Sequence, residues 1–190
     1  DDKETISSLE KKLESKDILI IAPGQTIHNY KVKVDESIKN NNSTVIGVNF
    51  APEEYHTDYV FISNIKRYNQ FIERSNKEDE TIIVTSNISS EIADYTVNYG
   101  SLRNSTQGVE DNVTLMLIKL LIKMGVRKVK IAGFDGYEAE ISDNYADKDM
   151  SIATISKERA IAMNTAISNE LAKLSKYIEI EFVTPTKYSF

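Results

Sequence analysis

The chain alternates short, continuously apolar runs with segments whose apolar residues recur every three or four positions. Continuous runs are typical of strands buried on both faces, whereas the three-to-four spacing is typical of helices with one buried side. Seven runs are read as strands, the fifth being the weakest and ending at a glycine. Their ranges are 17–22, 44–50, 58–63, 81–86, 94–100, 128–136 and 178–183.

Helices are expected before and between these strands. Their expected ranges are 4–15, 27–38, 64–74, 109–124 and 160–174. The second is expected as one helix because Ile27, Tyr30 and Val34 form a single stripe. The helix at 109–124 is apolar almost all round, so it should lie in the interior, and Gly125 should end it.

Apolar strands alternating with helices predict a parallel sheet covered on both sides. We therefore expect an α/β, Rossmann-like domain over residues 17–190, with a mostly parallel sheet of about six to seven strands. Residues 1–16 are read as a leading helix or a linker. They are highly charged, and the chain does not begin with Met, which favours a piece of a longer protein whose amino-terminal domain is missing.

Composition narrows the class of protein. The 190 residues are 41% hydrophobic and carry a net charge of −6, which argues against nucleic acid as a partner. The chain has no cysteine, so disulfides and thiolate metal sites are excluded, and we expect no metal site. No apolar run approaches the roughly 18 residues of a membrane span. We expect a cytoplasmic protein without a membrane partner, and a homo-oligomer is compatible with the sequence.

Candidate chemistry lies where the strands end, because parallel sheets bind ligands beyond the carboxyl ends of their strands. After the first strand come Pro23, Gly24, Gln25 and Thr26. Free backbone N–H groups at such a strand–glycine–helix turn can hold an anion, and an ordinary corner explains the same residues equally well. The turn matches neither the dinucleotide fingerprint nor the phosphate-binding loop of ATPases.

Amides and hydroxyls follow other strands. Asn49 and Asn64 end the second and third strands, and an Asn side chain offers both a donor and an acceptor to a base or sugar. Thr106 and Gly108 precede the interior helix and are expected to contact a sugar or base. The alternative for the two asparagines is capping of a helix or turn.

Acids, tyrosines and histidines complete the candidates. Asp135 is expected to point inward, whereas Glu138, Glu140 and Asp143 can hold Mg²⁺ or simply be solvated. Tyr137 and Tyr145 can close over a phosphate, or can pack under their loop. If the chain is a catalyst, the candidate proton acceptors are Asp135, His28 and Asp58, although both His28 and His56 also suit surface or capping roles.

The order of these segments resembles the bacterial sialyltransferases that use CMP-sialic acid. The resemblance covers Asp17 to Pro185 and rests on the segments "APGQTI", "VNF", "FISN", "STQG", "IAGFDGY" and "SDNY". It extends to the Rossmann-like proteins around motility accessory factors and archaeal pterin diphosphokinases. It implies nucleotide contacts, with CMP as the candidate ligand. The positions that match are Pro23, Gly24, Gln25, Thr26, Asn49, Asn64, Thr106, Gly108, Tyr137 and Tyr145.

One departure from that family concerns the catalytic base. The sialyltransferases place a histidine just before the last helix, where this chain has about Ile155. An isoleucine cannot accept a proton from a sugar hydroxyl, so sialyl transfer by this route is not expected.

A closer resemblance is to the carboxy-terminal domain of aldolase-like proteins. It rests on "ILIIAPGQTI", "VIGVNFAPEEYHTDYVFISNIKRY" and "IAGFDGY". Those proteins carry an amino-terminal barrel of the HMG-CoA lyase and 4-hydroxy-2-oxovalerate aldolase type, which would then be the partner of this domain. The lyase site would lie outside this chain.

Three functions therefore remain open. The first is an accessory module that binds a nucleotide or nucleotide-sugar beside an aldolase-like barrel. The second is a glycosyltransferase or phosphotransferase in its own right, and the third is an interaction or oligomerisation domain without a ligand.

Overall fold

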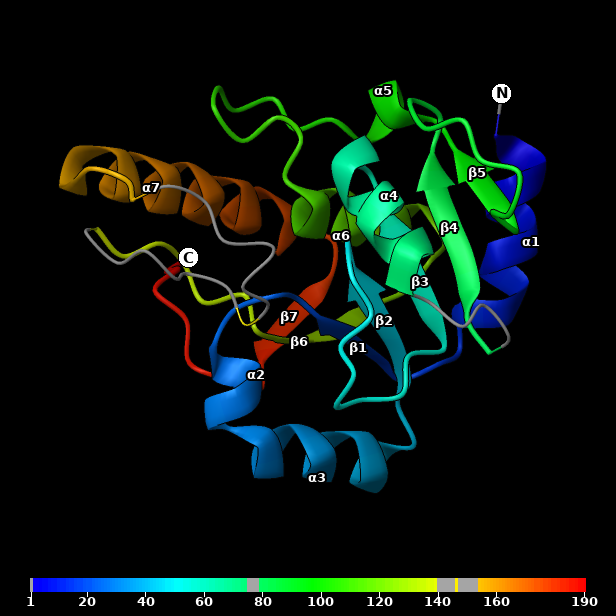
Figure 1. The fold of residues 1–190 in the computed structure, drawn as a ribbon, viewed down its shortest axis with the longest axis horizontal. Coiled ribbons are helices and arrows are strands. Elements are labelled where there is room, and N and C mark those ends of the chain that lie inside the picture. Colours follow the sequence, from blue (N-terminus) through cyan, green and yellow to red (C-terminus); the bar gives the residue numbers. More distant parts are fainter. Residues whose placement is uncertain (1, 75–78, 140–145, 147–153) are drawn as a thin grey trace.

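The computed structural model describes residues 2–74, 79–139, 146 and 154–190. It shows an α/β fold around one sheet of seven strands, all parallel, in the order β5-β4-β3-β2-β1-β6-β7 (Figure 1). The strands are β1 (Ile18–Ile21), β2 (Thr44–Val48), β3 (Tyr59–Ile62), β4 (Thr81–Thr85), β5 (Tyr95–Val97), β6 (Lys128–Ala132) and β7 (Glu179–Phe182).

The helices described lie before, between and after these strands. They are α1 (Lys3–Leu13), α2 (Thr26–Asn29), α3 (Lys31–Asn41), α4 (Ile65–Arg74), α5 (Tyr99–Leu102), α6 (Val113–Lys123) and α7 (Lys157–Leu174). No helix in the described ranges combines the length and apolar character needed to cross a membrane. The Rossmann-like α/β fold expected from the apolar pattern is confirmed.

Strand β1, which lies inside the sheet between β2 and β6, shows why the helices cover both faces of the sheet. All four of its residues are buried, and successive side chains point to opposite faces. Ile18 and Ile20 pack into one apolar cluster with α1, α6 and α7, whereas Leu19 and Ile21 pack into another with α2 and α3. A third cluster joins α4 to β3 and β4.

Helix α1 is part of this core. Leu9 and Leu13 are fully buried in the cluster that contains β1 and α6, and Lys12 hydrogen-bonds to Tyr95 of β5. In Figure 1 the helix lies beside β5 at one end of the sheet. Residues 3–13 therefore form a helix that covers the sheet and not a loose linker.

Several expected boundaries differ from the structure, and two of them mark a helix start that the spacing did not indicate. The helix expected at 27–38 is two helices, because the backbone leaves helical geometry at Tyr30 (φ −118°), whose side chain is exposed. The strand expected at 94–100 stops at Val97, since Asn98 accepts a hydrogen bond from Ser101 N and begins α5, which contains Gly100. Residue spacing alone does not reveal a change of helix axis or a new cap.

The interior helix begins later than expected. Asn112 caps α6 by accepting a hydrogen bond from Leu115 N at 3.1 Å, so residues 109–112 form turns, although Val109 is still buried in the core. The helix ends at Lys123, just before Gly125, as expected.

Candidate functional site

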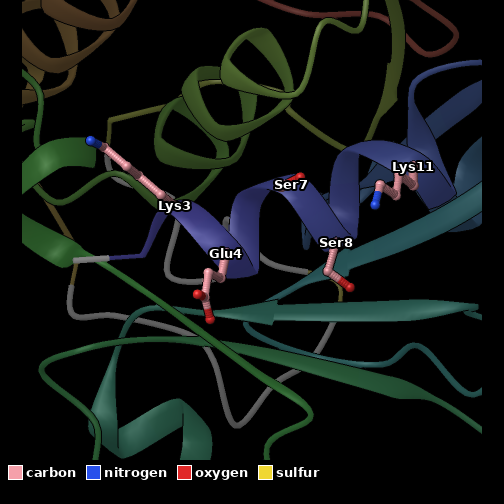
Figure 2. Close-up of a pocket in the computed structure, with 5 residues that line it drawn as sticks. All are labelled: Lys3, Glu4, Ser7, Ser8 and Lys11. Carbon is pink, nitrogen blue, oxygen red and sulfur yellow. The ribbon is translucent and has the colours of Figure 1, made fainter.

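The structure has a shallow surface groove of about 400 Å³ along α1 (Figure 2). Its lining residues are Lys3, Glu4, Ser7, Ser8 and Lys11. It contains none of the residues expected from the sequence to bind a ligand. Those of the expected residues that the structure describes lie instead around the carboxyl ends of the strands and on two loops.

The turns after β1 and β6 pack directly against each other. Gly24 N donates to Gly133 O at 2.7 Å, which extends the pairing of the two strands beyond their ends. A Cβ on Gly24 would overlap Gly133 O and the Asp135 side chain, and a Cβ on Gly133 would overlap Ala22 O. Both positions therefore need glycine because two loops of the chain itself approach closely.

Asp135 holds the start of α2. Its carboxylate accepts hydrogen bonds from Thr26 N at 3.0 Å and from the Thr26 hydroxyl. Thr26 Oγ1 also lies 2.8 Å from Thr184 Oγ1, which accepts from Gly133 N at 2.9 Å. Burial raises the pKa of the Asp135 carboxyl above its usual range, and the two hydrogen bonds from Thr26 oppose that rise.

This network changes the interpretation of the turn after β1. The sequence suggested that Gly24 leaves room for a ligand and that Thr26 N can hold a phosphate. In the structure, Asp135 fills the space beside Gly24 and accepts from Thr26 N. The anion at this helix start is therefore a side chain of the protein, and Pro23 O accepts a hydrogen bond from Ala146 N at 2.6 Å.

The two asparagines after β2 and β3 both use their side-chain oxygen within the fold. Asn49, which has a left-handed backbone (φ 60°), accepts from Ser63 N at 3.1 Å. Asn64 accepts from Arg67 N at 3.1 Å and so caps α4. Asn87, after β4, donates to Ser63 O at 3.0 Å. Asn49 and Asn87 thus join the ends of β2, β3 and β4 at one edge of the sheet.

The three candidate proton acceptors are not grouped together. His28 Nδ1 lies 2.6 Å from Glu54 Oε1, and its Nε2 lies 3.3 Å from Ala146 O. Asp58 precedes β3, so it lies at the amino end of that strand, on the opposite edge from Asp135. It accepts from Val45 N at 2.8 Å. The expectation that Asp58 lies near the strand ends is thus wrong, because it precedes its strand.

Tyr137 lies in the loop after β6, next to the last helix. Its backbone N donates to Asn164 Oδ1 at 2.8 Å, and its carbonyl accepts from Asn164 Nδ2 at 2.9 Å. Lys187 follows this loop closely, with Lys187 N donating to Asp135 O at 2.7 Å. Tyr145, Glu140 and Asp143 lie outside the described residues. Glu138 forms an ion pair with Lys187 at 2.6 Å.

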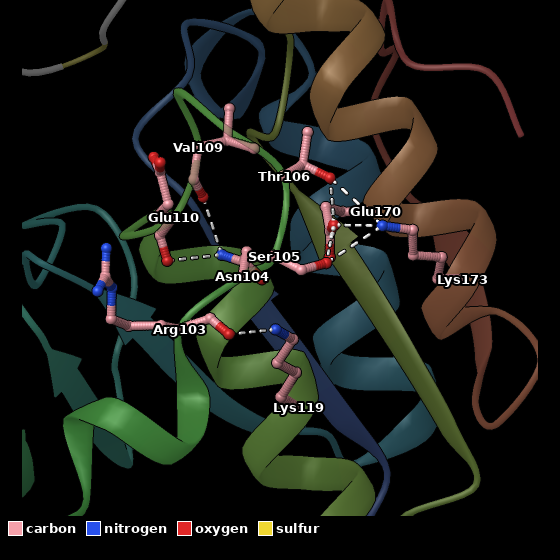
Figure 3. Close-up of polar contacts among 9 residues, drawn as sticks. All are labelled: Arg103, Asn104, Ser105, Thr106, Val109, Glu110, Lys119, Glu170 and Lys173. Carbon is pink, nitrogen blue, oxygen red and sulfur yellow. Dashed lines mark hydrogen bonds and ion pairs between the residues drawn. The ribbon is translucent and has the colours of Figure 1, made fainter.

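Thr106 and Gly108 belong to a different polar cluster, formed by the loop at 103–110 with α6 and α7 (Figure 3). The Thr106 hydroxyl donates to Glu170 Oε1, which also accepts from Lys173 Nζ at 2.8 Å and from Ser105 Oγ at 3.2 Å. Gly108 N donates to Glu110 Oε2 at 2.8 Å. These groups bind each other rather than the residues around Asp135.

Glu170 is an acid buried among apolar residues. Its side chain is only 3% exposed, so burial raises its pKa, but hydrogen bonds from Lys173 and Thr106 and the charges of Lys173 and Lys119 together lower it. Burial lowers the pKa of Lys119, whose Nζ donates to Arg103 O at 2.7 Å. Glu170 therefore ties the loop to α7 as a carboxylate.

Sequence reasoning missed Glu170 and Thr184. Glu170 lies on the same helix stripe as Ile167, Leu171 and Leu174, so a charged residue within an apolar stripe was an available signal. Thr184 contacts Thr26 across 158 positions of sequence, and no local pattern indicates such a pairing.

Among the described residues, no three His, Asp or Glu side chains are grouped closely enough to hold a metal ion. Comparison of the sequence with family models found no match, and comparison with curated proteins found none either.

Proposed function

We propose that this chain is a binding module for a nucleotide or nucleotide-sugar such as CMP or a CMP-sugar. In this proposal it serves an aldolase-like barrel of the HMG-CoA lyase or 4-hydroxy-2-oxovalerate aldolase type in a longer protein. The observation that carries the proposal is the row of amides at the carboxyl ends of β2, β3 and β4. Ligands of parallel α/β sheets bind at this edge.

The hydrogen bonds of these amides favour a ligand rich in acceptor atoms. Within the described part of the chain, Asn49 and Asn64 use their side-chain oxygens to hold Ser63 N and Arg67 N. Their N–H groups are then the atoms available to a ligand. Phosphate oxygens and the carbonyl oxygens of pyrimidines accept from such donors.

The packing around Gly24 favours the β2–β4 side of this edge. Asp135 occupies the position beside Gly24, so a phosphate there would meet a carboxylate. We therefore place the proposed ligand over Asn49 and Asn64. Tyr137 follows β6, which β1 separates from β2, so Tyr137 would contact only a ligand long enough to extend past β1.

Binding is favoured over group transfer because the acid–base candidates are engaged in the fold. Asp135 holds Thr26, and His28 contacts Glu54 and Ala146. Ile155, at the position of the sialyltransferase base, is buried just before α7. A transferase would need a proton acceptor that is free to reach a hydroxyl of its substrate.

The test is calorimetric titration of the chain with CMP, CDP, UDP, GDP and ATP. Asn64→Asp keeps the oxygen that caps α4 but replaces the N–H donors with a negative charge, so we expect at least about tenfold weaker binding. Asn42→Asp is the matched control. It makes the same change at the end of α3, beside the amino end of β2, and should leave affinity unchanged.

A second variant tests the loop contact. Tyr137→Phe/Tyr145→Phe removes two phenol groups and should also weaken binding, whereas Tyr177→Phe, just before β7, should not. If no nucleotide binds at millimolar concentration, the proposal is wrong and an interaction domain becomes the better account. If a nucleotide binds equally well to Asn64→Asp, the ligand lies elsewhere.

A further inference from the structure

A separate polar cluster, formed by Ser8, Lys12 and Tyr95, lies where α1 meets the edge strand β5. Lys12 Nζ donates to the Tyr95 phenol oxygen at 2.6 Å, and the side chain of Ser8 also hydrogen-bonds to Tyr95. Lys12 Nζ lies 5.2 Å from the centre of the Tyr95 ring. Two hydrogen-bonding groups from one helix thus converge on one phenol oxygen, and both stabilise negative charge there.

The net effect of the groups around Tyr95 is to lower the pKa of its phenol. The hydrogen bonds from Lys12 and Ser8 lower the pKa of the Tyr95 phenol, while partial burial and the charge of Asp94 oppose this. The pKa of Lys12 is raised, first by its hydrogen bond to Tyr95, so Lys12 remains an ammonium beside the phenol. Tyr59, the other phenol near Lys12, has its pKa raised by burial.

Tyr55 shows that a neighbouring lysine is insufficient for this effect. Lys31 Nζ lies 4.8 Å from the centre of its ring, yet Tyr55 donates its hydroxyl to Ile27 O at 2.5 Å. That side chain is buried, and burial raises the pKa of Tyr55 to about 12. Tyr95 differs from Tyr55 because Lys12 Nζ hydrogen-bonds to its phenol oxygen, whereas Lys31 Nζ lies over the ring of Tyr55.

Tyr95 is also accessible. Its side chain is partly exposed, and Ser8 belongs to the lining of the groove along α1. Figure 2 shows Ser8 and Lys11 on this face of the helix. Ser8 therefore both lines the groove and contacts the phenol oxygen of Tyr95.

We propose that Tyr95 is a nucleophilic phenol, a covalent modification site that takes sulfonyl electrophiles in preference to the more exposed Tyr177. In the reaction, the Tyr95 oxygen attacks the sulfur of an aryl sulfonyl fluoride. The oxygen–sulfur bond forms, the sulfur–fluorine bond breaks, fluoride leaves and the phenol proton passes to the buffer. Lys12 stabilises the phenolate and can hydrogen-bond to the departing fluoride.

The experiment treats the full chain with an aryl sulfonyl fluoride and maps the label by peptide mass spectrometry over time. Tyr95 should be labelled several-fold faster than Tyr177, although Tyr177 is 65% exposed. Lys12→Met should slow labelling of Tyr95 to the rate of Tyr177. Lys16→Met, after the end of α1 and outside the lining of the groove, also removes one exposed positive charge and should leave the rate nearly unchanged.

The dependence of the rate on pH separates activation from simple exposure. In the wild type, the midpoint for labelling of Tyr95 should lie at lower pH than in Lys12→Met, because the ammonium favours the phenolate. Circular dichroism checks that both variants fold, which is expected since Lys12 is exposed. Equal midpoints, an unchanged rate in Lys12→Met, faster labelling of Tyr177, or label on Lys12 instead of Tyr95 would each overturn the proposal.

Discussion

At the scale of single residues, the side chain of Asp135 occupies the space that a side chain at Gly24 would fill, although the two residues are far apart in sequence. The absent side chain of Gly24 lets Asp135 reach Thr26, and the hydrogen bonds to Thr26 fix the start of α2. The sequence indicated Gly24 as a candidate ligand contact and Asp135 as an inward-pointing acid and candidate proton acceptor. It could not show that each serves the other, because the contact is made only after β1 and β6 pair.

Gly24→Ala should destabilise the fold. The added Cβ would overlap Gly133 O and the Asp135 side chain, and backbone atoms cannot move aside cheaply. We expect a loss of about 1–3 kcal/mol in the free energy of unfolding, measured by urea denaturation. Gly100→Ala is the control, because a Cβ there meets only Asn98 Oδ1 at 3.4 Å within a helix. Equal stabilities of the two variants would contradict this account of Gly24.

Asp135→Asn should change how stability depends on pH. Burial raises the pKa of Asp135 above 3.8, so the folded chain holds this proton more tightly than the unfolded chain. The contribution of Asp135 to stability is then present at low pH and is lost as pH rises through its raised pKa. Asn does not titrate.

The measurement for Asp135 is urea denaturation of both proteins at several pH values. The free energy of unfolding of the wild type minus that of Asp135→Asn should fall as pH rises from below the ordinary pKa of an aspartate through the raised pKa of Asp135. Asp79→Asn, at an exposed acid, controls for the loss of one charge. A difference that rises over the same range would show that the hydrogen bonds from Thr26 outweigh burial.

At the scale of elements, the helices were easier to locate than to delimit. The stripe of α1 was visible in the sequence, but only the structure shows that Leu9 and Leu13 complete the core. The break at Tyr30 and the caps at Asn98 and Asn112 were missed because each depends on where the chain must turn to cover the sheet. The spacing of apolar residues indicates which side of a helix is buried, but it does not indicate where the helix axis changes direction.

Leu13→Ala tests whether α1 is a structural part of the domain. Leu13 is fully buried, so its truncation should reduce the free energy of unfolding by about 2–5 kcal/mol. Lys11→Ala, on the exposed side of the same helix, should change it by less than about 0.5 kcal/mol. Thermal denaturation followed by circular dichroism measures both. If Leu13→Ala left the free energy of unfolding unchanged, α1 would not be a structural part of the domain.

At the scale of the whole molecule, the parallel sheet and its two covered faces could be predicted because apolar runs and stripes alternate along the chain. The grouping of polar residues could be predicted only in part. Strand order brings Asn49, Asn64 and Asp135 to one edge, as the ends of parallel strands require. Thr106 and Gly108 instead join the Glu170 cluster, because the loop that carries them lies against α6 and α7.

The position of β1 between β2 and β6 has a consequence for synthesis of the protein on the ribosome. Ile20 lies early in the chain, whereas its partner Ile131 in β6 lies more than a hundred positions later. At roughly 5–20 residues per second, β1 waits on the order of ten seconds for that neighbour. During this interval one edge of the nascent sheet stays unpaired, and such edges invite pairing with other chains. Other nascent copies, translated from the same messenger RNA, are therefore the chains most able to pair wrongly with this exposed edge.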